Sequence, residues 1–168
     1  MTTPRLILAT VLILALALPA IWLFSSDDSQ HVTMPGTDDD TMVVFMSPYC
    51  GCCGDWVDHL EEAGFRTEIR ETDAVNAIKE EAGLPRDLVS CHTGFISGYL
   101  IEGHVPADDI HRLLQERPDA LGLSVPRMPV GSPGMEIEGQ GRDAFDVVLF
   151  DRDGNREVFN HYPEQSSL

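Results

Sequence analysis

Basic residues are scarce in this chain. Its 168 residues include 11 basic and 28 acidic side chains, a formal net charge of −17, and Lys79 is the only lysine. Because binding to DNA or RNA needs Lys and Arg opposite the phosphates, this composition argues against a nucleic-acid partner. The same charge suits metal cations, although acidic residues spread over a surface more often serve solubility.

Several other sequence features are missing. The chain has no phosphate-binding loop, dinucleotide fingerprint, GxSxG elbow, internal repeat or Asn-x-Ser/Thr sequon. Its four cysteines are too few for a disulfide-built scaffold, and their clustering favours chemistry. With 43% hydrophobic residues the chain is not a disordered acidic polymer, and its length fits one domain with an appendage.

The N-terminal segment predicts export. Residues 6–24 form a run of 19 residues without a charge, which as a helix would span a hydrocarbon core of about 30 Å. Arg5 precedes the run and Asp27 and Asp28 follow it, so we expect a cytoplasmic N-terminus and a periplasmic or extracellular remainder. We favour an uncleaved anchor in residues 1–24 over a cleaved signal peptide, since the cleavage sites are poor. Residues 25–41 are acidic and aperiodic and predict a flexible tether.

Hydrophobic periodicity predicts an α/β domain over residues 42–163. Expected strands alternate with expected helices, which implies parallel pairing through crossovers, and Asp151 to Gly154 is a hairpin signal that adds an antiparallel edge. A Gly/Pro-rich loop is expected over 121–142. The expected strands are 42–46, 65–70, 93–101, 145–150 and 155–160, and the expected helices start near Cys53, Ala74 and Pro106.

The most informative stretch is Cys50-Gly51-Cys52-Cys53, between an expected strand and an expected helix. The positive end of a helix stabilises a thiolate, which is both a nucleophile and a metal ligand. Cys50 and Cys53 have the C-x-x-C spacing of thiol–disulfide catalysts. Cys52 complicates two-thiol redox cycling but supplies the further sulfur that a metal site uses, and three thiolates could bridge two or more Cu(I) ions.

Further candidate ligands lie later in the chain. Cys91 or His92 could reach the cysteine cluster, depending on strand register, and His104 precedes a helix as a candidate imidazole ligand. Met128 and Met135 sit in a Pro/Gly-rich segment that cannot be helical, so they are either thioether ligands, which favour Cu(I), or apolar plugs of a long loop.

The remaining histidines and acidic pairs carry weaker signals. His59 and His111 are expected to be solvated on helices. Asp151 and Asp153 resemble a calcium loop, but a hairpin turn explains them fully.

Four sequence blocks together resemble one family. The chain is similar to the exported CxCC proteins of bacterial copper resistance, the CopG type, over residues 42–162 and without departure in these blocks. The resemblance implies a thioredoxin-like fold and a role in copper handling. It implies as ligands Cys50, Cys52, Cys53, Cys91, His104, Met128 and Met135. The blocks are SPYCGCCGDWVDHLEEAGF, AGLPRDLVSCHTGFISGYLIEGHVPADDIHRLL, VPRMPVGSPGME and VVLFDRDG.

Three functions fit these residues. The first is a periplasmic copper protein that binds Cu(I), in one or several ions, and interconverts Cu(I) and Cu(II), which would make it a copper oxidoreductase. Its partners would be copper-export or copper-delivery proteins and, through residues 6–24, the inner membrane. The second is a thiol–disulfide oxidoreductase that acts on proteins through Cys50 and Cys53. The third is a structural zinc site, which leaves the methionines unexplained.

Overall fold

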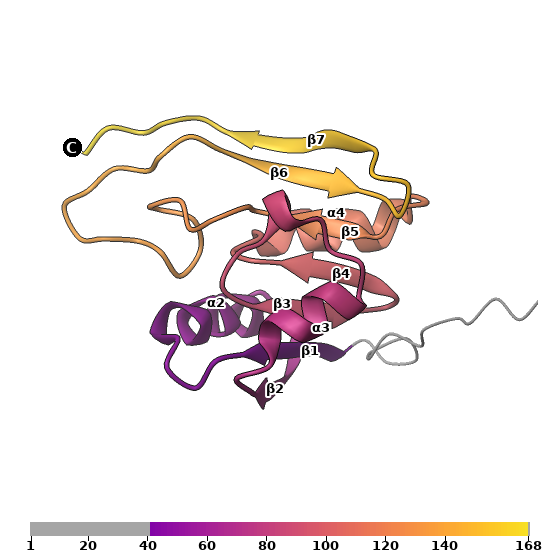
Figure 1. Ribbon diagram of the computed structural model, residues 1–168. Coiled ribbons are helices and arrows are strands. Elements are labelled where there is room, and N and C mark those ends of the chain that lie inside the picture. The colour runs from indigo at the N-terminus through magenta and orange to yellow at the C-terminus, as the bar shows by residue number, and fades with distance from the viewer. Residues whose placement is uncertain (1–40, 168) are drawn as a thin grey trace, which may run out of the picture. The chain divides into compact units, whose positions relative to one another are not determined.

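The computed structural model of the chain describes residues 41–167. These residues form one mixed α/β unit with a seven-stranded sheet in the order β2-β1-β3-β4-β5-β6-β7 (Figure 1). The strands are β1 (Thr41–Met46), β2 (Arg66–Glu71), β3 (Thr93–Ile96), β4 (Tyr99–Glu102), β5 (Gly122–Ser124), β6 (Phe145–Phe150) and β7 (Arg156–Tyr162). The helices are α2 (Gly51–Glu62), α3 (Val75–Glu81), the 3-10 turn η1 (Arg86–Leu88) and α4 (Ala107–Glu116).

Two of the strand pairs are parallel and the other four are antiparallel. β1 pairs with β2 and β4 pairs with β5 in parallel, each through a crossover helix, as the alternation of elements predicts. β3 is antiparallel to both β1 and β4, so the parallel pairing expected for the strand at 93–101 is wrong.

β3 and β4 form a hairpin inside the segment 93–101, which is predicted from the sequence as one strand, and this hairpin explains their antiparallel pairing. Ser97 and Gly98 have positive φ angles of 48° and 86°, and they reverse the chain in a two-residue turn between β3 and β4. The sequence does not predict this turn, because its first position usually holds Asn, Asp or Gly and here holds Ser97.

A short strand also lies within the expected loop over 121–142. β5 has only three residues, too few for an alternating pattern, and it pairs with β4 on one side and β6 on the other. A Cβ on Gly122 would overlap the carbonyl oxygen of Leu100, so this close approach of β5 to β4 requires glycine.

The helices cover both faces of the sheet. α2 and α4 bury Trp56, Leu60 and Ile110 against side chains of the inner strands such as Val44 and Ile101. α3 and η1 lie on the opposite face, where Ala82 and Leu88 pack with Phe95, Leu100 and Phe150. Figure 1 shows α3 in front of the sheet and α4 behind it. Because successive residues of β1 point to opposite faces and both faces are covered, β1 is nearly continuous in apolar residues.

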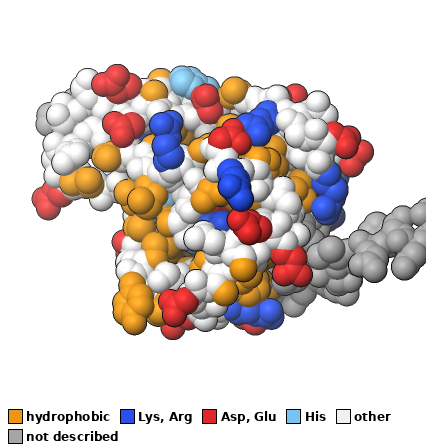
Figure 2. Space-filling view, in the orientation of Figure 1, with side chains coloured by type: hydrophobic (Ala, Val, Ile, Leu, Met, Phe, Trp, Pro, Cys, Tyr) orange, Lys and Arg blue, Asp and Glu red, His pale blue; other side chains and the backbone are white. Residues whose placement is uncertain are grey.

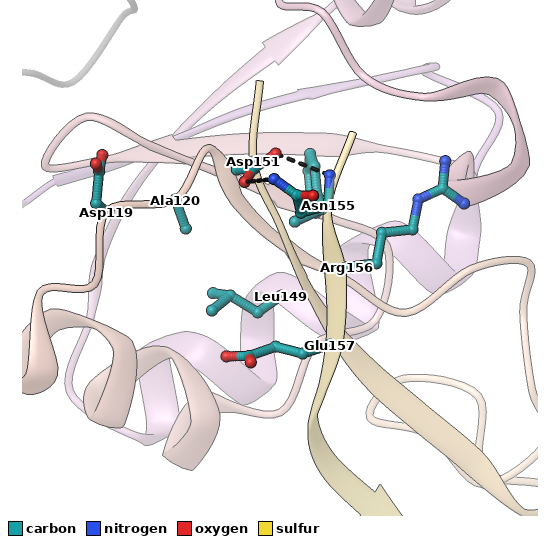
Figure 3. Close-up of a pocket in the computed structure, with 8 residues that line it drawn as sticks. Asp119, Ala120, Leu149, Asp151, Asn155, Arg156 and Glu157 are labelled. Atoms are coloured by element: carbon teal, nitrogen blue, oxygen red, sulfur yellow. Dashed lines mark hydrogen bonds between the residues drawn. The ribbon is translucent and has the colours of Figure 1, made fainter. Parts of the chain in front are cut away.

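The C-terminal hairpin forms the edge predicted from the sequence. The Asp151 carboxylate accepts hydrogen bonds from the backbone N–H groups of Asp153 and Asn155, both at 2.9 Å. Figure 3 shows Asp151 and Asn155 at the turn, joined by dashed lines that mark their hydrogen bonds. The carboxylate is thus used by the turn, as expected for a hairpin.

Acidic and basic side chains are mixed on the face that Figure 2 shows, where Lys and Arg are interspersed with Asp and Glu. Within residues 41–167 no helix combines the length and apolarity needed to cross a membrane. The predicted anchor and residues 25–40 of the predicted tether lie outside the described residues.

Candidate metal centre

Three of the four cysteines lie at the start of α2, in its N-cap and first turn. Cys50 is the N-cap residue, and its backbone N–H donates to the carbonyl of Ser47 at 3.1 Å, which turns the chain out of β1 and into the helix. The Sγ atoms of Cys50 and Cys53 form a disulfide, and Cys52 Sγ lies 3.6 Å from Cys50 Sγ. Cys53 is fully buried whereas Cys50 and Cys52 are half-buried, so the cluster opens to solvent on one side.

The fourth cysteine comes from the segment before β3. Cys91 has a free thiol, and all four sulfur atoms lie within 4.8 Å of one another. β1 and its antiparallel neighbour β3 thus bring Cys91 to the three cysteines that follow β1. Four sulfur atoms at such separations form a soft donor set.

Two histidines extend this cluster. Cys91 Sγ lies 3.1 Å from His104 Nε2 and 3.3 Å from His92 Nδ1, and the three residues form a second group of donor atoms within 4.8 Å. His104 Nδ1 lies 2.7 Å from the carbonyl oxygen of Pro133. Because a carbonyl only accepts, His104 Nδ1 carries the hydrogen, and the Nε2 lone pair is directed at Cys91.

Burial sets the protonation of these groups. Burial holds the pKa of His92 well below its usual range, with the nearby His104 adding to the effect, and burial also lowers the pKa of His104. Both imidazoles are therefore neutral at neutral pH, which is the form that binds metals. Burial raises the pKa of the Cys91 thiol to about 11, so a metal ion must displace its proton.

The ring of His92 is packed on both sides but incompletely hydrogen bonded. It lies 4.2 Å from the ring of Trp56 and 5.0 Å from that of His104, between ring centroids. Its Nε2 atom is buried and has no hydrogen-bond partner among the described residues. A buried nitrogen without a partner is costly, and the other ring nitrogen, Nδ1, is the one that faces Cys91.

A buried ion pair holds the segment that carries Cys91. Lys79 Nζ, from α3, lies 2.6 Å from Glu102 Oε1 and donates to the carbonyl oxygens of Ser90 at 2.8 Å and His92 at 3.4 Å. Glu102 in turn accepts a hydrogen bond from the backbone N–H of Ser90 at 2.6 Å. The backbone of Ser90 and His92, on both sides of Cys91, is therefore held in place by this ion pair.

Sequence analysis missed this pair. Lys79 follows Val75 by four residues, on the buried side of α3, and this position of the only lysine was the available signal. The expectation for His59 is wrong as well. It is half-buried, and its Nε2 atom accepts a hydrogen bond from the backbone N–H of Ala107 at 3.1 Å, at the start of α4. His111 is exposed as expected, with its ring stacked on Phe65.

The two candidate methionines lie in different surroundings. Met135 is half-buried and follows Gly134, where a Cβ would lie 2.6 Å from Trp56 N and 2.9 Å from Cys52 O. The segment next to Met135 therefore rests on the first turn of α2. Met128 is 49% exposed and lines a hollow of about 540 Å³ with Asp143 and other residues. Copper ligation by either methionine stays a prediction.

Another hollow, of about 220 Å³, lies beside the C-terminal hairpin (Figure 3). Its lining includes Asp119, Asp151 and Arg156 but, among the described residues, no cysteine, histidine or methionine. It shares no residue with the donor cluster.

The fold and the site together define a mixed α/β protein with a buried cysteine–histidine cluster suited to a soft metal. Two solved structures are similar to this chain, "Copper resistance protein copG- Form 1" and "Form 2". Each is 46% identical and covers 73% of this chain, with 97% and 98% of their own lengths matched and TM-scores of 0.69 and 0.70. The chain belongs to the CopG-type copper-resistance family.

Two further comparisons complete this result. The family model described as "Protein of unknown function, DUF411" matches residues 88–135, which include Cys91, His92 and His104 but not the cysteines of α2. No curated protein matches the chain.

Proposed function

We propose that this chain is a periplasmic copper-binding protein of copper resistance that chelates Cu(I) at the cysteine–histidine cluster. The observation that carries the proposal is the gathering of four sulfur atoms, from two distant segments, within 4.8 Å of one another. Family membership supports copper as the metal, since the similar structures are named copper resistance proteins.

The donor chemistry favours the monovalent ion. Thiolates are soft ligands that select Cu(I), and neutral imidazoles such as those of His92 and His104 also suit copper. Once the disulfide is reduced, Cys50, Cys52, Cys53 and Cys91 supply enough thiolates to bridge more than one ion. In this proposal Met135 and Met128 add thioether ligands from the loop.

The arrangement of the first four strands favours a thioredoxin-like interpretation. β2-β1-β3-β4 form a mixed sheet with helices on both faces, and the Cys50–Cys53 disulfide sits at the start of the helix that follows β1. On this interpretation β5, β6 and β7 are an extension. The uncharged run 6–24 supports tethering to the inner membrane, where copper-export or copper-delivery proteins would be partners.

The cysteines also provide a route between the two copper oxidation states. Two Cu(II) ions take one electron each from the thiols of Cys50 and Cys53, which form a disulfide and release two protons. The products are two Cu(I) ions and the disulfide. This reaction makes the protein a copper oxidoreductase as well as a chelator.

Copper retention tests the proposal. The full chain, purified in detergent and reduced, is loaded with Cu(I) and challenged with a competing Cu(I) chelator. The wild type is expected to keep its copper, a Cys50/Cys52/Cys53→Ser variant to lose the copper that these cysteines bind, and a His161→Ala variant, changed at a surface histidine, to behave as the wild type. Complete loss of copper from the wild type would refute the proposal.

One observation favours a second function, thiol–disulfide exchange on proteins. The disulfide joins the half-buried Cys50 to the fully buried Cys53, so Cys50 is the sulfur open to attack, as in such enzymes. An insulin-reduction assay discriminates the two functions. Rapid turnover by the metal-free protein favours exchange, whereas slow turnover with tight copper retention favours copper binding.

A further inference from the structure

The candidate metal centre contains two overlapping donor groups that respond differently to the disulfide. The first group is formed by the sulfur atoms of Cys50, Cys52, Cys53 and Cys91, and the second by Cys91 with His92 and His104. The disulfide removes two of the four sulfur donors of the first group. It removes no donor of the second group.

The second group is arranged for a metal while the disulfide is intact. Its Sγ–Nε2 and Sγ–Nδ1 distances are 3.1 and 3.3 Å, so the three atoms need to separate only slightly to bind one ion at bond lengths of about 2.0–2.3 Å. The hydrogen bond from His104 Nδ1 to Pro133 orients the His104 ring. The Lys79–Glu102 pair holds the backbone at Ser90 and His92.

We infer that the Cys50–Cys53 disulfide switches the centre between two copper-binding states. With the disulfide formed, Cys91, His92 and His104 hold a single copper ion. With the disulfide reduced, the additional thiolates join and the centre holds more copper. The inference rests on the proposed function and specifies how the capacity of the same site is regulated.

The switching step needs two electrons and two protons. A dithiol reductant supplies both: one of its sulfur atoms attacks Cys50 Sγ, the Cys50–Cys53 bond breaks, and Cys53 leaves as a thiolate. The second thiol of the reductant then displaces Cys50 from the mixed disulfide. The reductant ends as a disulfide, and Cys50 and Cys53 end as two thiols. Attack falls on Cys50 because Cys53 is fully buried.

The test compares the copper capacity of the two forms of the full chain in detergent. The disulfide form is verified by the mass of the alkylated protein, which carries labels on Cys52 and Cys91 only. The reduced form is prepared with dithiothreitol, which is then removed without oxygen. Both forms receive excess Cu(I) and are desalted, and copper per chain is measured.

The disulfide form is expected to hold about one copper ion per chain and the reduced form at least about twice as much. A Cys50→Ser/Cys53→Ser variant, which cannot form this disulfide, is expected to hold the lower amount with or without dithiothreitol. His104→Ala should lose the copper of the disulfide form, whereas the surface variant His161→Ala should keep it.

Cysteine alkylation of the wild-type protein tests the inference without relying on a variant that could fail to fold. In the disulfide form, bound Cu(I) should slow alkylation of Cys91 more than alkylation of Cys52, because only Cys91 belongs to the histidine group. Equal protection of both cysteines would overturn the assignment of the single-ion site.

The outcomes separate the inference from the proposed function. If the disulfide form holds no copper while the reduced form does, or if both forms hold equal amounts, the switch is refuted and copper binding stands. If neither form holds copper, the proposed function itself fails.

Discussion

Lys79 Nζ lies 2.6 Å from Glu102 Oε1, in an ion pair whose two side chains are only 3% and 0% exposed. Burial raises the pKa of Glu102, and the Lys79 charge opposes that shift. The same lysine donates to carbonyl oxygens on both sides of Cys91. The ion pair therefore holds the backbone that positions Cys91 in the candidate metal centre.

Removing one partner of this pair should destabilise the fold. We expect Lys79→Met to lower the free energy of unfolding by about 3–5 kcal/mol, because Glu102 is left buried without its counter-charge. Denaturant unfolding of the full chain, followed by circular dichroism, measures this loss. Arg86→Met is the control, since the Arg86–Glu80 pair is 93% and 71% exposed and should contribute less than about 1 kcal/mol. A Lys79 variant no less stable than the Arg86 variant would contradict the prediction.

Gly134 offers a test of the loop that covers α2. A Cβ at Gly134 would lie 2.6 Å from Trp56 N and 2.9 Å from Cys52 O, so Gly134→Ala should lift this loop and displace the Pro133 carbonyl that orients His104. We expect at least about tenfold weaker copper binding, measured by chelator competition.

Gly139→Ala is a closely matched control for this substitution. The φ angles of Gly134 and Gly139 are 78° and 76°, but a Cβ at Gly139 meets no atom within 4 Å. Both substitutions therefore carry the same backbone strain, of about 1–2 kcal/mol, and only Gly134→Ala adds a clash. Equal copper affinity of the two variants would show that the loop does not support the site.

The half-buried Cys91 thiol should lose its proton only at high pH in the metal-free protein. Because burial disfavours the charged form, its pKa is raised to about 11, and the reactive thiolate is rare at neutral pH. The alkylation rate of Cys91 in the disulfide form should therefore keep rising up to about pH 11, as followed by peptide mass spectrometry. A rate that levels off below pH 9 would contradict this protonation state.

Trp56 should report copper at the histidine group. Its ring lies 4.2 Å from that of His92, and the only other tryptophan in the chain is Trp22. In a Trp22→Phe background, Cu(I) should quench the fluorescence of Trp56, and a His92→Gln/His104→Ala variant should lose most of this quenching. Undiminished quenching in that variant would place the bound copper elsewhere.

Local patterns were sufficient to predict much of the fold. The strand at 42–46 and the hairpin around Asp151 to Gly154 have strong signals within a few residues, and the structure confirms both. Ser97 and Gly98 were missed because serine rarely starts such a turn, and β5 was missed because three residues carry no period. Short, non-local strand pairing of this kind is decided by the tertiary fold.

The candidate site likewise contains residues that local sequence patterns predict and residues that only the tertiary fold brings together. The grouping of three cysteines at a helix start follows directly from the sequence, whereas the approach of Cys91 depends on the antiparallel pairing of β1 with β3. Lys79 could not be assigned to the site from the sequence, because its partner Glu102 is 23 residues away and the contact exists only in the folded chain. The cap that His59 provides to α4 is hidden for the same reason.

X-ray absorption at the copper edge of the reduced, Cu(I)-loaded full chain reports both the oxidation state of the bound copper and its ligand atoms. If the cysteine–histidine cluster binds Cu(I), the edge is typical of Cu(I) and the first shell is dominated by sulfur, with a smaller nitrogen contribution that falls in the His92→Gln/His104→Ala variant. A first shell of nitrogen and oxygen alone, without sulfur neighbours, would contradict binding at this cluster.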